Sequence, residues 1–185
     1  TSIVNPHASI SLVVRDRDGR TIEKGDWPRT TDKLPRTVIE IRPHPHGIQL
    51  GSLQRMLKES GERKLTSFLR HNFSGVSMRA AREILSASGL DESRSPKRIT
   101  ANEAQSMVSS FRKVKLLSPP TDCLSPIEDL LIKKGLSKAI DSRFASTITR
   151  SPKVSNGNPF QIEVGLVFGG DLGADGPIEI LRFAN

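Results

Sequence analysis

Two proline clusters divide this sequence into a middle segment with helical patterns and two flanks with strand-like patterns. The clusters are Pro43-His44-Pro45 and Pro119-Pro120. Proline fixes its own backbone and restricts the residue before it, so regular structure usually ends at such clusters. Apolar residues recur at helical spacing between the clusters and alternate with polar residues outside them. We therefore predict an α+β chain of more than one domain.

The middle segment carries the signals of four helices. Apolar stripes at helical spacing mark residues 49–60 and 65–73. Ser77 can cap a third helix that ends at Gly89. Thr100 and Glu103 have the spacing of a capping box, and an apolar face follows them as far as Val114.

The flanks carry short strand patterns. In the first flank we expect strands at residues 8–14 and 37–41, with a turn at Asp18-Gly19 and a loop at residues 25–28. In the second flank, Ser125 to Glu128 reads as a capping box that opens a helix over residues 127–134, ended by Gly135. Residues 160–168 and 178–181 should then pair as a hairpin.

The positive charge of the chain is concentrated in the middle segment. The whole chain has a formal net charge of +8, and residues 47–117 alone contain 13 basic and 6 acidic residues. Such a local excess indicates a polyanionic partner, either nucleic acid or an acidic membrane surface. No run approaches the roughly 18 apolar residues of a membrane span. We predict nucleic acid, with no membrane partner.

Five cations are the candidates for DNA contacts. Arg79 and Arg82 lie near a helix start, and Arg112, Lys113 and Lys115 crowd a helix end. Lys and Arg supply affinity for duplex DNA by displacing counterions from phosphates. The same residues could instead form a solvated surface that suits a helix C-terminus. Aromatic residues make up only 4% of the chain, which disfavours a dedicated single-strand binder.

The remaining motifs do not favour a metal, cofactor or catalytic site. His44 and His46 form a His-x-His pair, but Cys123 is the only cysteine and a zinc site needs further ligands at recognisable spacing. A rigid connection into the helical segment is the better interpretation of these histidines. The run Gly169–Gly176 lacks the Gly-Lys-Ser/Thr ending of a phosphate loop, so a hairpin loop is expected. We predict no metal ligands, no cofactor-binding residues and no catalytic residues in this segment.

Three ordered segments resemble one family, the B subunit of DNA topoisomerase VI. They are residues 42–53 (RPHPHGIQLGSL), residues 112–127 (RKVKLLSPPTDCLSPI), and residues 149–152 (TRSP) leading to residues 157–165 (GNPFQIEVG). Residues 5–8 and 181–185 also resemble the family, so the likeness covers essentially the whole chain. Because the chain starts at Thr1 and not at Met, we interpret it as an internal fragment.

The resemblance implies three domains. Residues 1–44 would form the C-terminal edge of a gyrase/Hsp90-like ATPase domain. Residues 45–117 would form a helix–two-turns–helix domain, and residues 118–185 the N-terminal part of an α/β transducer domain.

The resemblance also implies the function of the complete protein, an ATP-dependent type IIB topoisomerase. Such an enzyme relaxes and decatenates duplex DNA by strand passage, using ATP and Mg²⁺. Its B subunits dimerise when ATP binds, and the transducer relays that closure to the DNA-cleaving A subunit of a heterotetramer. The location would be intracellular, namely the nucleus of a eukaryote or the cytoplasm and nucleoid of an archaeon.

The sequence departs from the family pattern at two places. One is the linker Ser151–Asn156, which looks unlike the usual form at several positions, and the other follows Ile127. Ser-Pro-Ile is typically followed by Gly-Glu in the family, whereas here Glu128 follows Ile127 directly. The family's nucleotide-binding motifs would lie upstream of Thr1, and its lysine for the ATP γ-phosphate would lie downstream of Asn185. The fragment alone is therefore expected to show neither ATPase nor cleavage activity. The absence of tyrosine, the family's cleaving nucleophile, fits the subunit that does not cut DNA.

Two alternative functions remain open at this point. One is a non-catalytic B-like scaffold in a meiotic break-forming complex, which would keep the architecture without ATP turnover. The other is a free-standing DNA-binding module like the helical domain of some DNA glycosylases. The flanking strand patterns argue against the second alternative, because such a module would not need them.

Overall fold

The structure is a computed structural model that describes residues 2–173 and 176–184. Its contacts divide the chain into two compact units. The helical unit comprises residues 38–124 and 152–160, and the sheet unit comprises residues 1–37, 125–151 and 161–185. Helices and small antiparallel sheets occur together, in agreement with the predicted α+β class.

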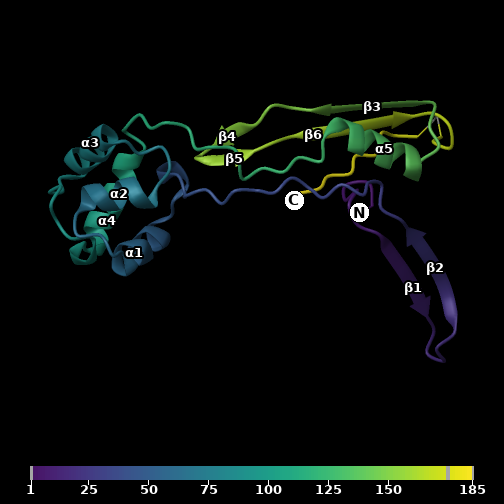
Figure 1. Ribbon diagram of the computed structural model, residues 1–185, viewed down its shortest axis with the longest axis horizontal. Helices are drawn as coiled ribbons and strands as arrows, with labels where there is room; N and C mark the ends of the chain where they lie inside the picture. Colours follow the sequence, from purple (N-terminus) through teal and green to yellow (C-terminus); the bar gives the residue numbers. More distant parts are fainter. Residues whose placement is uncertain (1, 174–175, 185) are drawn as a thin grey trace. The chain divides into compact units, whose positions relative to one another are not determined.

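Four helices form the centre of the helical unit, and all four were predicted (Figure 1). Their side chains enclose one apolar core in which Leu53, Phe68, Leu85, Met107 and Phe111 are fully buried. Burying each such side chain contributes about 1.5–3 kcal/mol. The helices are α1 (Leu50–Glu59), α2 (Leu65–Asn72), α3 (Met78–Ser88) and α4 (Ala101–Phe111), with short 3₁₀ turns η1 (Pro45–Gly47) and η2 (Pro96–Arg98).

The two N-caps predicted for α3 and α4 are present. The Ser77 hydroxyl accepts a hydrogen bond from the backbone N–H of Ala80, and the helix that it caps ends at Gly89 in the left-handed conformation. Thr100 and Glu103 form the complete capping box at the start of α4. These local signals define the helix ends because each one satisfies backbone groups that the helix leaves unpaired.

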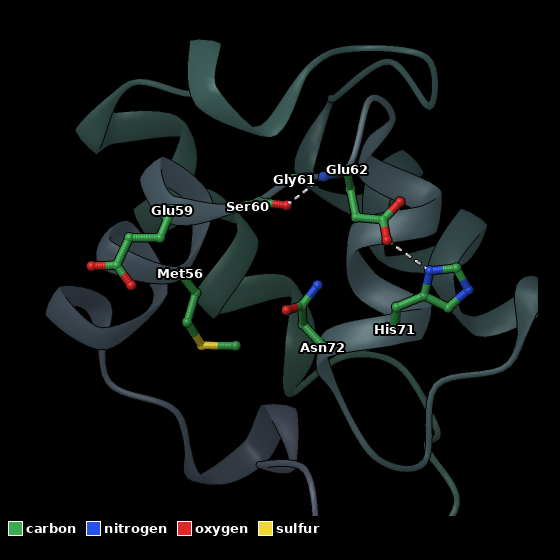
Figure 2. Close-up of a pocket in the computed structure, with 7 residues that line it drawn as sticks. All are labelled: Met56, Glu59, Ser60, Gly61, Glu62, His71 and Asn72. Atoms are coloured by element: carbon green, nitrogen blue, oxygen red, sulfur yellow. Dashed lines mark hydrogen bonds and ion pairs between the residues drawn. The ribbon is translucent and has the colours of Figure 1, made fainter.

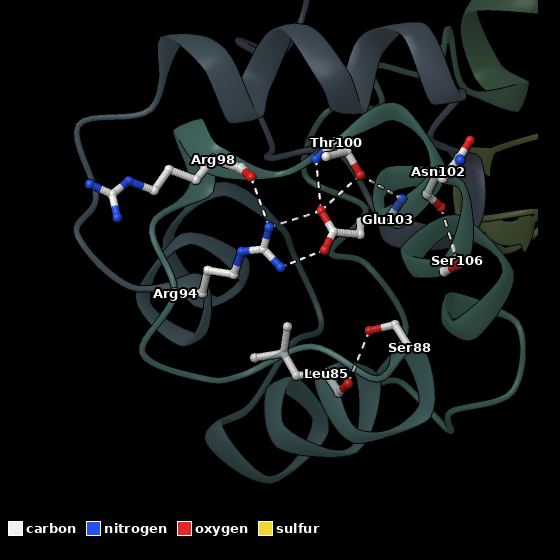
Figure 3. Close-up of polar contacts among 8 residues, drawn as sticks. All are labelled: Leu85, Ser88, Arg94, Arg98, Thr100, Asn102, Glu103 and Ser106. Atoms are coloured by element: carbon white, nitrogen blue, oxygen red, sulfur yellow. Dashed lines mark hydrogen bonds and ion pairs between the residues drawn. The ribbon is translucent and has the colours of Figure 1, made fainter.

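Glu103 also joins α4 to the loop that follows α3 (Figure 3). Its carboxylate forms an ion pair with Arg94, whose Nη2 donates to Glu103 Oε2 over 3.1 Å and to the Arg98 carbonyl over 3.0 Å. Hydrogen bonds from Thr100, first from its backbone N–H and then from its hydroxyl, together with Arg94, lower the pKa of Glu103 to about 2. This charge therefore serves the fold.

A hairpin from far along the chain belongs to the helical unit. Strands β4 (Lys153–Ser155) and β5 (Asn158–Phe160) pair in antiparallel fashion around Asn156 and Gly157. Gly157 has a φ of 75°, and a Cβ placed there would lie 2.7 Å from His44 Nδ1. The hairpin turn is thus in close contact with the ring of His44.

The two rings of the His-x-His pair bind backbone groups at both ends of the helical segment. His44 is only 5% exposed, its Nε2 lies 3.0 Å from the Leu117 carbonyl, and its Nδ1 accepts from the His46 backbone N–H. His46 Nε2 lies 3.0 Å from the Phe111 carbonyl. Burial lowers the pKa of His44, so the ring is neutral and Nε2 carries its proton.

The sheet unit contains two antiparallel strand pairs and one helix. Strand β1 (Ile10–Arg15) pairs with β2 (Thr21–Trp27), and β3 (Phe144–Thr149) pairs with β6 (Glu163–Phe168). Helix α5 (Asp129–Ala139) packs on the second pair, where Ile132 and Leu136 lie against Gly165 (Figure 1).

In the first flank one strand was predicted correctly and its partner was not. Residues 37–41 form no strand, and Ile39 makes a single backbone hydrogen bond to the Asp122 carbonyl. The partner of β1 is instead β2, which includes Gly25 to Trp27 where we expected a loop. Exposed residues predominate in β2, so it lacks the alternation that marks a half-buried strand.

In the second flank the helix and the hairpin both differ from the prediction. Helix α5 starts at Asp129 and continues through Gly135, where a Cβ would lie 2.9 Å from the Ile3 carbonyl oxygen. Close packing against residue 3, and not helix termination, accounts for this glycine. Strand β6 pairs with β3, and residues 178–181 form no strand. Of the predicted Gly169–Gly176 loop, residues 174 and 175 lie outside the described residues.

The capping box predicted at Ser125 is also wrong. The Ser125 hydroxyl donates to the Arg36 carbonyl, and the N-cap of α5 is Glu128, which makes no side-chain cap. The carboxylate of Glu163 takes over this role, because it accepts the backbone N–H groups of Ile127 and Glu128 over 2.8 Å each. Glu128 is held at φ 74° and ψ 146°, a conformation that strongly favours glycine.

The backbone of residue 128 predicts a stabilising substitution. A non-glycine residue in this region costs about 1–3 kcal/mol, and glycine loses about 0.5–1 kcal/mol in chain entropy. The Glu128→Gly variant should therefore be more stable than the natural chain by about 1 kcal/mol, measured by urea unfolding. Glu128→Ala retains a Cβ and should show no comparable gain. Equal stability of the Gly and Ala variants would contradict the strain assigned to this residue.

The contact between Gly157 and His44 predicts a destabilising substitution. Gly157→Ala places a methyl group against the His44 ring in a backbone conformation that costs L-residues about 1–2 kcal/mol. We expect a loss of at least about 2 kcal/mol in the free energy of unfolding. Gly51→Ala is the matched control, because nothing lies within 4 Å of a Cβ at that helical position. If the Gly157→Ala variant were as stable as the natural chain, that result would contradict the close contact between the hairpin and His44.

The lowered pKa of Glu103 predicts an acid-dependent contribution to stability. Because the folded-state pKa is about 2 against an ordinary value of 4.5, the contribution is complete above about 4.5 and is lost as the pH falls towards 2. Thermal midpoints of the natural chain and of Glu103→Gln should differ near neutral pH and converge near pH 2. A difference that stays constant over this range would show that the ionised carboxylate contributes nothing.

Candidate nucleic-acid interface

The two arginines predicted on α3 are exposed, and both are paired with carboxylates. Arg79 Nη1 lies 2.6 Å from Glu83 Oε1, one turn further along the helix. Arg82 Nε lies 3.2 Å from Glu92 Oε2, in the loop after α3. Exposed ion pairs of this kind contribute about 0–1 kcal/mol, so a phosphate can replace either carboxylate at small cost.

The three cations predicted at the end of α4 are in a different state. Arg112 is the C-cap of the helix, and Lys113 and Lys115 follow it with exposed side chains. None of the three forms an ion pair within residues 2–173 and 176–184. The negative end of the helix dipole favours cations here. Because the three cations form no ion pair among these residues, their charged groups are available to a phosphate backbone.

The histidines next to this cluster hold the end of α4 in place. The His46 ring binds the Phe111 carbonyl, immediately before Arg112, and the His44 ring binds the Leu117 carbonyl, two residues after Lys115. The backbone that carries the three cations is therefore held at both of its ends. Within the described part of the chain, no group of three or more His, Cys, Asp or Glu side chains could hold a metal ion.

A depression of about 290 Å³ lies between α1 and α2 in the same unit (Figure 2). Met56 and Asn72 line it together with Glu59 and Glu62, and His71 Nδ1 lies 2.8 Å from Glu62 Oε1. Two carboxylates repel phosphate, so this depression does not belong to a nucleic-acid interface.

The charge count of the sequence overstates the free charge of the unit, and the five candidate cations leave out one exposed pair. Arg94 is held by Glu103, as Figure 3 shows, and has no role at the surface. Lys97 and Arg98 are exposed on η2, and the Arg98 side chain extends away from the neighbouring residues in the same view. Their signal in the sequence was two consecutive cations directly after Pro96.

No helix in the part of the chain that the structure describes is both long and apolar enough to cross a bilayer. This finding concerns helices α1 to α5, whose longest members have 11 residues.

Comparison with known proteins identifies relatives of the whole chain. The sequence is 48% identical to the B subunit of type 2 DNA topoisomerase 6 from Methanococcoides burtonii over all of its 185 residues. It is 47% identical to the same subunit from Methanosarcina barkeri and 39% identical to that from Archaeoglobus fulgidus. Each alignment covers 100% of this chain and 29–30% of the relative, so the chain spans less than a third of these proteins.

The second flank matches a family by itself. Residues 119–185 match the family model described as the topoisomerase VI B subunit, transducer. Two independent comparisons thus agree with the resemblance found in the sequence. The chain is similar to the type 2 DNA topoisomerase 6 B subunits along its whole length, and its residues 119–185 match the model of their transducer.

Proposed function

We propose that this chain is part of the ATP-binding B subunit of a type IIB DNA topoisomerase and that its helical unit contacts duplex DNA. The observation that carries the DNA contact is the group of Arg112, Lys113 and Lys115, exposed and without ion pairs at the end of α4. The family rests on the relatives, which are B subunits of type 2 DNA topoisomerase 6.

The proposed contact is to the phosphate backbone and not to base edges. Positioning contacts to phosphates come from Lys and Arg and carry no sequence information. The α4 cluster has two lysines, which act as point charges, and a single arginine. A topoisomerase that passes any duplex segment through another needs this sequence-independent binding.

Arg79 and Arg82 form the second part of the proposed interface. Their carboxylate partners must give way to phosphates, so each contributes less to affinity than an unpaired cation does. Both residues lie in the first half of α3, where the positive end of the helix dipole also attracts a phosphate.

The remaining roles follow from the family and concern the complete protein. ATP and Mg²⁺ would be bound outside this segment, and ATP-driven dimerisation of two B subunits would capture a duplex. The segment from residue 118 onwards would then transmit closure to a DNA-cleaving A subunit in a heterotetramer. The domain limits 1–44, 45–117 and 118–185 are part of this proposal.

A salt titration of duplex binding tests the DNA contact. The logarithm of the binding constant should fall with the logarithm of the salt concentration by about 0.9 per phosphate contact. Lys113→Gln/Lys115→Gln should reduce this slope by about 1–2, and Arg79→Gln/Arg82→Gln by a smaller amount. Fluorescence anisotropy of a labelled duplex provides the measurement.

The control removes two charges elsewhere. Lys134→Gln/Arg150→Gln changes two exposed cations of the sheet unit and should leave the slope unchanged. Binding without salt dependence, or a slope that neither helical-unit variant alters, would mean that the basic residues of the helical unit form only a solvated surface.

A further inference from the structure

Residues 118–185 contain a basic cluster that their overall charge conceals. Residues 118–185 carry 7 basic and 8 acidic residues, which predicts no anion site there. Four of the seven basic residues nevertheless lie within one short stretch. They are Lys133, Lys134 and Lys138 on α5 and Arg143 just before β3.

Two of these cations line a depression of about 550 Å³ at the corner between α5 and β3. Lys133 and Ser137 line it from the helix, and Ser142 and Arg143 line it from the connection into β3. No hydrogen bond or ion pair of the Lys133 or Arg143 side chain occurs among residues 2–173 and 176–184. The depression thus combines two free cations with two hydroxyl groups.

The neighbouring cations are in different situations. Lys138 donates to the carbonyls of Pro28 and Arg29, over 2.6 and 3.2 Å, and so binds another part of the sheet unit. Lys134 is exposed but does not line the depression. The helix dipole offers one reason for cations in the last turn of α5. It does not account for Lys133, in the middle of the helix, or for Arg143, beyond its end.

The walls of the depression are fixed by packing. Lys133 and Ser137 are one turn apart on α5, and the adjacent Ile132 and Leu136 hold the helix against Gly165 of β6. On the other side, the turn after β6 lies against residues 141–143. A Cβ at Gly169 would lie 3.2 Å from the Cβ, Cγ and Cδ atoms of Arg143, and one at Gly170 would lie 2.2 Å from the Asp141 carbonyl oxygen.

This turn can lie against residues 141–143 because of its glycines. Both Gly169 and Gly170 have a φ of 71°, and the Asp171 backbone N–H donates to the Asp141 carbonyl over 3.0 Å. The stem of Arg143 is thereby held before any ligand arrives, which lowers the entropy cost of binding. Asp141 lines the depression as well, and its negative charge reduces the positive potential there.

From this arrangement we infer a phosphate-binding site at the α5–β3 corner, with Arg143 and Lys133 as the charged ligands and Ser137 and Ser142 as hydroxyl donors. Arginine binds phosphate oxygens through two parallel N–H groups, and lysine adds a compact point charge. The phosphate can belong to a nucleic-acid backbone or to a free polyphosphate. The site is independent of the DNA contact proposed on the helical unit.

Amide NMR spectra of the whole chain, titrated with inorganic pyrophosphate and separately with a short duplex, test this site. Pyrophosphate should shift the amide signals of residues 133, 137, 142 and 143 in a saturable way. Lys133→Ala/Arg143→Ala should weaken that binding by on the order of tenfold. Lys134→Ala/Arg150→Ala removes one lysine and one arginine from exposed positions outside the depression and should leave it unchanged.

The outcomes separate the two sources of phosphate. Shifts at the corner with the duplex as well as with pyrophosphate identify a backbone contact, and shifts with pyrophosphate alone identify a polyphosphate site. Absence of saturable shifts with both probes, or equal weakening in the two double variants, would overturn the site. Lys113→Gln/Lys115→Gln should retain the pyrophosphate shifts, so a failure of the helical-unit proposal stays distinguishable from a failure of this one.

Discussion

The helical unit depends on one buried ring, that of His44. An imidazole removed from water without hydrogen bonds costs several kcal/mol, and here both nitrogens have backbone partners. Those partners, together with Gly157 against the ring, come from the start of the segment, from its end at Leu117 and from a hairpin about forty residues later. A single side chain thus holds together the start of the helical segment at His46, its end at Leu117 and the turn between β4 and β5. The His44 ring therefore also holds the backbone that carries the proposed DNA contacts at the end of α4.

Charge in this chain has two uses that a count of residues does not distinguish. The ion pair of Arg94 and Glu103 stabilises the start of α4. Hydrogen bonds from Thr100 lower the pKa of Glu103 and keep its carboxylate ionised. Arg79 and Arg82 form exposed ion pairs that contribute little to stability, so a phosphate can replace their carboxylate partners. The cations at the end of α4, and Lys133 and Arg143 at the α5–β3 corner, combine exposure, a fixed backbone and no ion-pair partner among the described residues. These properties, and not net charge, separate a binding surface from a solvated one.

Local signals predicted the helices well and the sheets poorly, for a physical reason. A helix is encoded within its own residues by an apolar stripe and by caps such as Ser77 and Thr100, whereas a strand needs a partner that the sequence does not name. Strand β3 was not predicted from the sequence, and residues 178–181 were predicted as a strand that does not form. The five candidate cations could be chosen from the sequence, but their pairing could not, since Arg82 meets Glu92 only through the loop after α3. The α5–β3 corner could not be predicted from net charge, because the basic and acidic residues of the whole segment 118–185 cancel in the count.

Residue 128 shows how a distant contact can impose a conformation that the local sequence opposes. The family resemblance places glycine after Ser-Pro-Ile, and the backbone here keeps the glycine-like conformation although the residue is Glu128. The two N–H groups at residues 127 and 128 converge on the carboxylate of Glu163, which also accepts the Thr149 hydroxyl. Three charge-assisted hydrogen bonds outweigh about 1–3 kcal/mol of backbone strain. The start of α5 is therefore determined by β6, and through α5 the position of Lys133 at the proposed phosphate site is determined by β6 as well.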